Sequence, residues 1–182
     1  MKDLSLNLLD IAENSVKAEA TLTQLLLTQE GNTLTFQVVD DGKGMTEEIL
    51  RGVVDPFYTT RTTRKVGMGL PLLRLAAEQT GGTMEVESRH RDTHPADHGT
   101  VVTAVFHTDH IDCPPVGDLV ATVTTLIQGH PDTDFYFRHT TDTVQVELDT
   151  RDLRQVLGDV SLAEYEVLQW ISGYLTDQYN GQ

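Results

Sequence analysis

One helical stretch near the N-terminus carries polar side chains at spacings that suit a binding site. Asp10, Asn14 and Lys17 lie four and three residues apart, so a helix places a carboxylate, an amide and an ammonium group on one side. Such a column can line a ligand site. A solvated helix face carries the same residue types, so the column alone predicts either a site or an ordinary surface.

A second candidate stretch runs from Val38 to Met45, where an apolar run ends in Asp40-Asp41-Gly42-Lys43-Gly44. β-Branched residues favour a strand, and glycines adopt φ > 0 at no steric cost, so a strand leads into a tight turn that permits close approach. Asp40 is expected to be half-buried, where a carboxylate needs a hydrogen-bond partner. A plain strand-to-helix connection with Thr46 as N-cap explains the same residues.

A third stretch is cationic and precedes a helix. Arg61, Arg64 and Lys65 come before two glycines, and Pro71 is well placed in the first helical turn. Free N–H groups at a helix start favour an anion such as phosphate. A surface loop that ends in a helix cap is the alternative.

Two other sets of reactive residues predict no site. His90, His94 and His98 are evenly spaced, but Pro95 opposes the helix that would gather them around a metal, so we expect a polar loop. Cys113 is the only cysteine and cannot form an internal disulfide.

Composition narrows the possible partners. The 182 residues carry a net charge of −15. A chain this acidic lacks the positively charged surface that a nucleic-acid-binding protein needs. No apolar run approaches the roughly 18 residues of a membrane span, and the N-terminus lacks the features of a signal peptide. We therefore expect a cytoplasmic protein that binds neither nucleic acid nor membrane.

Hydrophobic periodicity predicts alternating helices and strands. In the first part, helices are expected at 3–19, 46–53 and 71–80, and strands at 21–28, 33–39, 83–88 and 100–106. In the tail, we expect helices at 117–128 and 151–157, a hairpin of 134–139 with 143–148, and a last helix that a capping box at Ser161–Glu164 begins. Because about 70 residues make a marginal core, this tail should pack on the first part.

In order and spacing, these stretches resemble the motifs of the GHKL ATPase superfamily, which includes DNA gyrase B, heat-shock chaperones, histidine kinases and mismatch-repair ATPases. The segments that look like its N, G1, F and G2 boxes, and like the last position of its pocket, are Asp10–Ala18, Asp40–Met45, Asp55–Thr60, Val66–Leu70 and Gly99-Thr100. The resemblance implies an α+β fold, a two-layer sandwich of the Bergerat type over residues 1–108, with a small α+β subdomain over 112–182.

The resemblance also implies ATP and Mg²⁺ as ligands. Asp40 would accept a hydrogen bond from the adenine amino group, Asn14 and Asp10 would hold Mg²⁺, and Lys17 would lie near the phosphates. Thr100 would add a hydroxyl group. The other implied nucleotide-binding residues are Gly42, Gly44, Met45, Phe57, Thr60, Arg61, Arg64, Lys65, Val66, Gly67, Met68, Gly69 and Leu70.

Two positions depart from the family pattern. Asp10 stands where hydrolysing members carry a glutamate as general base, and an aspartate reaches about one methylene less far, so it can act through water or only help to hold Mg²⁺. Lys65 replaces the first glycine of the usual Gly-x-Gly-x-Gly, which implies a stiffer and shorter lid over the phosphates.

We interpret the chain as an ATP-binding regulatory or conformational-switch protein in which any ATPase activity is slow. Two alternatives stay open: a serine/threonine kinase of the anti-sigma-factor type that acts on a partner in trans, and a non-catalytic partner-binding module. A complete histidine kinase is not expected, because all seven histidines lie at or after His90. The resemblance to short proteins of redox and hydrogenase-type systems implies a protein partner of that kind, and a homodimer is the other expected assembly.

Overall fold

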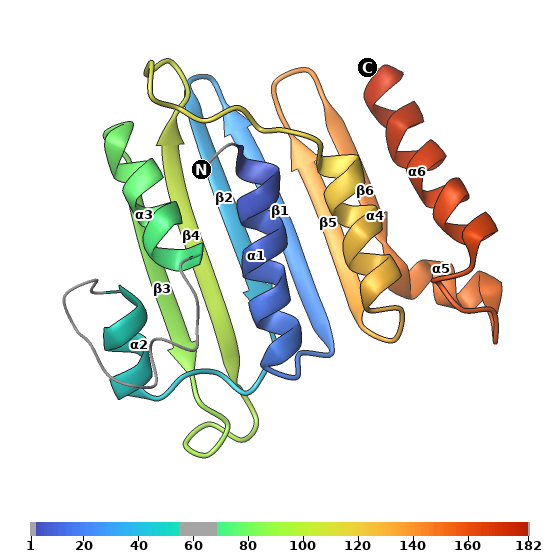
Figure 1. Cartoon of the computed structure of the whole chain (residues 1–182), viewed down its shortest axis with the longest axis horizontal. Helices are drawn as coiled ribbons and strands as arrows, with labels where there is room; N and C mark the ends of the chain where they lie inside the picture. Colours follow the sequence, from blue (N-terminus) through green and yellow to red (C-terminus); the bar gives the residue numbers. More distant parts are fainter. Residues whose placement is uncertain (1–2, 55–68, 182) are drawn as a thin grey trace.

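The computed structural model describes residues 3–54 and 69–181. Six strands form one mixed sheet in the order β3-β4-β2-β1-β5-β6. Helices α1, α3 and α4 lie over one face of this sheet, as Figure 1 shows. The α+β fold that the motifs predicted is confirmed. None of the helices within the described ranges is long and apolar enough to cross a membrane.

The elements follow the predicted order, with boundaries that differ by a few residues. The helices and strands are α1 Leu4–Lys17, β1 Leu22–Glu30, β2 Thr33–Asp40, α2 Glu47–Val54, α3 Gly69–Gln79, β3 Thr83–Arg89, β4 Gly99–His107, α4 Leu119–Gly129, β5 Asp134–Thr140, β6 Gln145–Asp149, α5 Thr150–Leu157 and α6 Tyr165–Asn180.

The prediction of a capping box at Ser161 is wrong. Helix α6 begins at Tyr165, and its N-cap residue Glu164 makes no side-chain capping bond. The Ser161 hydroxyl oxygen instead accepts a hydrogen bond from the Ala163 N–H at 3.1 Å, within the turn before the helix. Local bonding of a serine to a nearby backbone group competes with its use as a helix cap.

Alternation along the strands places the core between the sheet and α1. Leu25 and Leu27 of β1 are fully buried, as is Leu8 of α1, which belongs to the same hydrophobic cluster. Helix α1 also buries the polar side chain of Asn7. Asn7 is only 4% exposed, and its Oδ1 has no hydrogen-bond partner among the described residues.

The tail extends the sheet. Strand β5 pairs in parallel with β1, with Leu25 opposite Phe137, and β6 pairs antiparallel with β5. A side-chain contact also joins the tail to α1: His130 Nε2, at the end of α4, lies 2.9 and 3.0 Å from the two carboxylate oxygens of Glu13. Backbone pairing and this side-chain contact therefore both tie the tail to the elements of the N-terminal half.

His139 of β5 should make the stability of the chain depend on pH. Its side chain is buried, with Nδ1 2.8 Å from the Tyr179 hydroxyl, and burial lowers the pKa of this imidazole. A lowered folded-state pKa means that the unfolded chain binds more protons. The free energy of unfolding is therefore highest above a pH of about 6.5 and decreases as the pH falls.

Urea midpoints at pH 7.5 and 5.5 should show this loss of stability in the wild type and a smaller loss in His139→Gln. The exposed His110 offers a matched control, His110→Gln. An unchanged pH dependence in His139→Gln would contradict the assignment.

Candidate functional site

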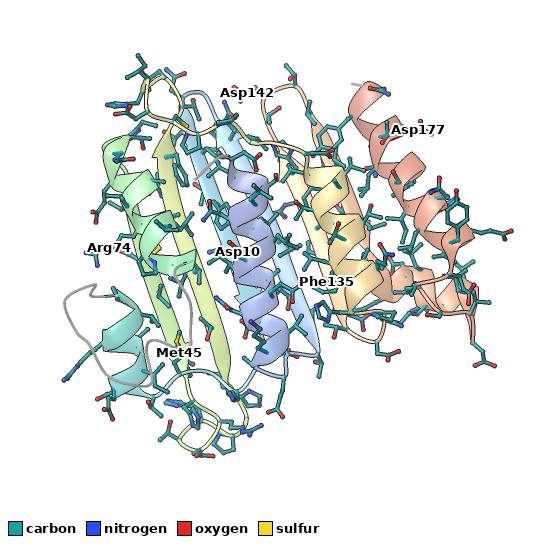
Figure 2. All side chains as sticks on the ribbon, viewed as in Figure 1. Asp10, Met45, Arg74, Phe135, Asp142 and Asp177 are labelled. Carbon is teal, nitrogen blue, oxygen red and sulfur yellow. The ribbon has the colours of Figure 1, made fainter. Side chains whose placement is uncertain are left out.

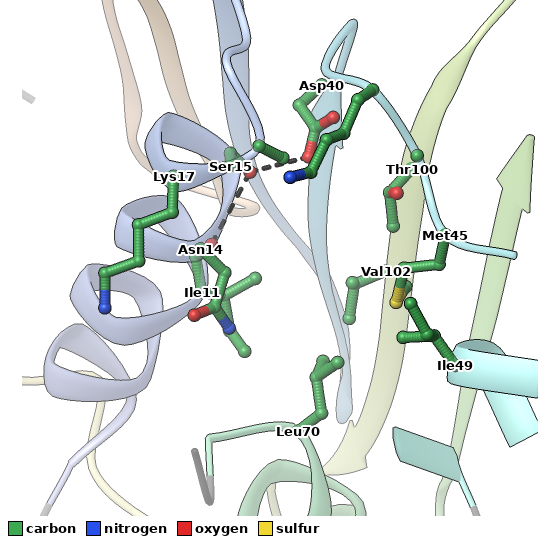
Figure 3. Close-up of a pocket in the computed structure, with 13 residues that line it drawn as sticks. Ile11, Asn14, Ser15, Lys17, Asp40, Met45, Ile49, Leu70, Thr100 and Val102 are labelled. Carbon is green, nitrogen blue, oxygen red and sulfur yellow. Dashed lines mark hydrogen bonds between the residues drawn. The ribbon is translucent and has the colours of Figure 1, made fainter. Parts of the chain in front are cut away.

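Asp40 ends β2 and turns its carboxylate toward α1. The Ser15 hydroxyl donates to Oδ2 at 2.7 Å, and the Gly42 N–H donates to Oδ1 at 2.9 Å. The contact with Ser15 is drawn in Figure 3. The carboxylate thus has the partners that partial burial requires. Ser15 was missed as a site residue, and the signal that could have revealed it is a hydroxyl group on the apolar stripe of α1.

Asp41 has a different, structural task. It accepts hydrogen bonds from the backbone N–H groups of Thr21 at 2.7 Å and Leu22 at 3.0 Å, and from the Thr21 hydroxyl. Burial alone would raise the pKa of the Asp41 carboxyl, but these hydrogen bonds outweigh it and lower the pKa below its usual value. Asp41 therefore fixes the end of β2 to the start of β1.

Both glycines of the turn after β2 are required by contacts within the chain. A Cβ on Gly42 would lie 2.8 Å from the carbonyl oxygen of Ala18. Gly44 has φ of +72°, and its Cβ would lie 2.0 Å from the carbonyl oxygen of Arg89. Larger residues would push the turn away from the end of α1 or from the β3–β4 hairpin, so the glycines fix its position.

The polar loop between β3 and β4 holds the other side of this turn. His98 Nδ1 lies 2.5 Å from the carbonyl oxygen of Gly42, and the Arg91 N–H donates to the Lys43 carbonyl at 2.8 Å. The Lys43 N–H in turn donates to the Ala18 carbonyl at 2.8 Å. The histidine-containing loop therefore contributes to the site by positioning the turn.

A cavity of about 300 Å³ opens in front of Asp40, between α1, β2, β4 and the start of α2 and α3 (Figure 3). This volume is at the lower end of the range of small-molecule sites, roughly 300–1,000 Å³. Asp40 supplies the only carboxylate among the described residues that line it. The lining residues are Ile11, Asn14, Ser15, Lys17, Ala18, Asp40, Lys43, Gly44, Met45, Ile49, Leu70, Thr100 and Val102.

The structure brings together many of the predicted site residues. Those that line the cavity are Asn14, Lys17, Asp40, Gly44, Met45, Leu70 and Thr100. In Figure 3, the ammonium group of Lys17 lies beyond Asn14 as seen from Asp40. The Thr100 hydroxyl lies 2.8 Å from that of Ser88, whose oxygen accepts the Met45 N–H at 2.7 Å. Ser88, which the sequence analysis did not select, therefore links two lining residues.

Other predicted residues lie beside the cavity or outside the described ranges. Gly42 is buried behind Asp40, and Asp10 is exposed on α1 (Figure 2), so neither is a lining residue. The Asp10 Cβ would be 3.5 Å from a Cβ placed on Gly69, the first residue of α3. The predicted residues outside the described ranges are Phe57, Thr60, Arg61, Arg64, Lys65, Val66, Gly67 and Met68.

Residues 2–110 match the profile of the histidine kinase-, DNA gyrase B- and HSP90-like ATPase family. The chain belongs to this family. The GHKL ATPase relationship that the motifs indicated is therefore confirmed over more than half of the chain. The cavity is consistent with ATP binding, because its described lining includes the Asp40 carboxylate and the Asn14 amide.

Sensor histidine kinases are among the similar sequences. The chain is 32% identical over 88 residues to sensor histidine kinase ZraS of Klebsiella oxytoca, a match over 48% of this chain and 19% of that protein. It is 32% identical over 99 residues to sensor histidine kinase YvrG of Bacillus subtilis, over 51% of this chain and 16% of that protein. The chain thus spans less than a fifth of the length of these curated relatives.

Two solved structures of low sequence identity share the fold of this chain. The MutL ATPase domain of Aquifex aeolicus, complexed with ADP, superimposes with a TM-score of 0.51 at 12% identity, over 80% of this chain and 63% of that one. The N-terminal domain of a DNA repair protein gives a TM-score of 0.52 at 17% identity, over 81% of this chain and 51% of that one. At these identities the likeness shows the fold alone.

Proposed function

We propose that this GHKL ATPase domain binds ATP with Mg²⁺ in the cavity in front of Asp40, and that binding switches its interaction with a protein partner. The observation that carries the proposal is the placement of one hydrogen-bonded carboxylate in a largely apolar cavity. Ile11, Ile49 and Val102 supply apolar surface for a flat base. Asp40 supplies an acceptor for the adenine amino group, and a guanine would place a carbonyl oxygen against that acceptor.

The residues on α1 suit the phosphate end of the ligand. Asn14 lines the cavity and offers an amide oxygen, a ligand type that the hard cation Mg²⁺ accepts alongside phosphate oxygens. Mg²⁺ would shield the charge of the phosphates when bound. Lys17, one turn further along α1, would add a cation. Asp10 stands where hydrolysing members of the family carry a glutamate, and its reach is about one methylene shorter, which supports slow turnover in preference to rapid hydrolysis.

The connections of α1 supply a route from the cavity to the tail. Glu13 precedes Asn14 and bonds His130 at the end of α4, while β1, next to the Asp40 strand, pairs with β5. A movement of α1 on nucleotide binding would therefore reach α4 and the tail. This connection supports a conformational-switch role.

Asn14→Ala should remove the Mg²⁺ dependence of ATP binding. In the wild type, EDTA should weaken ATP binding, whereas in the variant ATP affinity with Mg²⁺ should fall to the level measured with EDTA. Isothermal titration with and without EDTA measures both values. Glu13→Gln is the matched control, because Glu13 lies on the same helix but bonds His130 outside the cavity. If the Mg²⁺ dependence survives in Asn14→Ala, Asn14 is not the Mg²⁺ ligand.

One incubation with Mg²⁺ and γ-labelled ATP tests the proposed role. We expect bound nucleotide and slow release of labelled phosphate, below the typical enzyme rate of about 1 s⁻¹ or more. Label transferred to serine or threonine residues of an added protein would replace the switch with the kinase alternative. The absence of retained nucleotide would contradict both and favour a non-catalytic binding module.

A further inference from the structure

The loop between β3 and β4, residues 90–98, packs against the turn that follows β2. Figure 1 shows the loop and the turn at the same end of the sheet. The contact is close, because a Cβ on Gly99, which follows the loop, would overlap the carbonyl oxygen of Asp40. Every residue of the loop is described, and none of them lines the cavity. The loop therefore adjoins the residue that is proposed to read the base, without itself meeting a ligand.

One peptide group of the turn, the one between Gly42 and Lys43, is held from both sides. Its N–H, from Lys43, donates to the Ala18 carbonyl just after α1 at 2.8 Å. Its carbonyl oxygen, from Gly42, lies 2.5 Å from His98 Nδ1. A carbonyl oxygen only accepts hydrogen bonds, so Nδ1 carries the proton and His98 is the donor. The loop thus fixes a peptide that the conformational freedom of glycine would otherwise leave able to rotate.

The orientation of Gly42 in turn fixes the Asp40 carboxylate. The Gly42 N–H donates to Asp40 Oδ1 at 2.9 Å, while the Ser15 hydroxyl donates to Oδ2 at 2.7 Å. Removal of the His98 donor would free the Gly42 backbone, and the bond to Oδ1 would weaken as its angle changes. The carboxylate would then rotate about its remaining contact with Ser15. The lone pair that adenine needs would point into the cavity for only part of the time.

His98 differs in this respect from the other histidines of the loop. His90 Nδ1 accepts from the Asp92 N–H at 3.2 Å, and His94 Nδ1 lies 2.9 Å from the Thr93 hydroxyl. Both of these contacts stay within the loop. The His98 side chain is half-buried, whereas His94 is exposed. His94 therefore supplies a matched control for His98.

Other contacts keep the loop in place independently of the His98 imidazole. The Arg91 N–H donates to the Lys43 carbonyl at 2.8 Å, and the Arg91 side chain forms an ion pair with Glu19 at 2.8 Å. Substitution of His98 should therefore leave the loop docked and remove one donor from the turn.

We propose that His98 is a positioning residue that sets the selectivity of the site for adenine. It acts by holding Gly42 and, through Gly42, the Asp40 carboxylate, and it contacts no ligand itself. The inference rests on the proposed function, since it requires adenine at Asp40. When the His98 donor is removed, the 6-amino group of adenine should contribute little to binding, while the rest of the nucleotide still binds.

Two nucleotides that differ only in the 6-amino group test this inference. ATP and purine riboside triphosphate, which lacks that group, are each titrated with Mg²⁺ into the full chain. In the wild type, ATP should bind about tenfold or more tightly than the analogue, the effect of one hydrogen bond to a charged group. In His98→Ala this ratio should fall to about threefold or less, because the variant and the analogue remove the same interaction. A role confined to fold stability would weaken both nucleotides equally and leave the ratio unchanged.

Three further variants separate the donor from the rest of the side chain. In His98→Asn the amide nitrogen is as many bonds from Cα as Nδ1 is, so the wild-type ratio should be restored. The control His94→Ala should also bind as the wild type does. His98→Phe keeps a planar ring without a donor, should show the low ratio, and gives the same test where the alanine variant does not fold.

The outcomes distinguish this inference from the proposed function. A wild-type ratio in His98→Ala or His98→Phe would overturn the positioning role and leave the ATP site intact. A ratio in His98→Asn as low as that in His98→Ala would also overturn it, because the donor would then not be the cause. A wild type that binds neither nucleotide, or both equally, would contradict the proposed adenine site and the inference with it.

Discussion

Replacing Asp40 with asparagine should weaken ATP binding roughly 30- to 150-fold, from a loss of about 2–3 kcal/mol for a hydrogen bond to a charged group. The wild-type carboxylate accepts from Ser15 and Gly42 and has lone pairs left for the adenine amino group. An asparagine keeps the shape of the side chain but replaces one acceptor with an NH₂ donor. That donor would face either the Ser15 hydroxyl or the adenine amino group. Isothermal titration with ATP measures the change.

Asp41→Asn is the matched control for this variant. The two carboxylates are adjacent in the chain, but Asp41 bonds Thr21 and Leu22 and is not a lining residue of the cavity. The control should lower the melting temperature and leave ATP affinity within about threefold, because the hydrogen bonds that lower its pKa stabilise the fold. An unchanged ATP affinity in Asp40→Asn, with circular dichroism showing a native fold, would contradict the proposed pocket.

Phe137→Ala should destabilise the whole chain by about 3–5 kcal/mol, the usual cost of emptying a large buried aromatic site. Phe137 is 1% exposed and lies opposite Leu25 in the parallel pairing of β5 with β1. Because that pairing joins the tail to the sheet of the N-terminal half, we expect one cooperative transition at a lower temperature. A shift of about 6–20 °C follows from that loss for a chain of this size.

Differential scanning calorimetry measures this transition. Ile111→Ala is the control, because Ile111 is 95% exposed and such substitutions usually change stability by less than about 0.5 kcal/mol. A separate early transition for the tail in Phe137→Ala, with the remainder melting as in the wild type, would show that the tail unfolds as an independent unit.

The sequence predicted the elements well where periodicity and turn residues agree. Leu4, Leu8 and Ile11 form the buried stripe of α1, and the strands predicted at 21–28 and 33–39 correspond to β1 and β2. The start of α6 was misplaced, because the sequence Ser161–Glu164 suits a turn as well as a cap. Local patterns of this kind do not distinguish which backbone group a serine will bond.

The sequence motifs predicted the residues that line the site, but not the residues that hold them in place. The Asp40 turn and Asn14 are recognisable as motifs because their types and spacing are unusual. Ser15 and His98 support that turn through contacts with residues 25 and 56 positions away in the chain, and such contacts follow from tertiary packing alone. The parallel pairing of β5 with β1 was likewise hidden, since the local sequence of a strand does not specify its distant neighbour.

The central claim is that the Asp40 cavity binds adenine nucleotide. Isothermal titration of the full chain with ATP and with GTP, each with Mg²⁺, tests it most directly. We predict one ATP bound per chain and at least tenfold weaker binding of GTP, because a guanine would face the Asp40 carboxylate with a carbonyl oxygen. No measurable ATP binding, or equal affinity for ATP and GTP, would contradict the account.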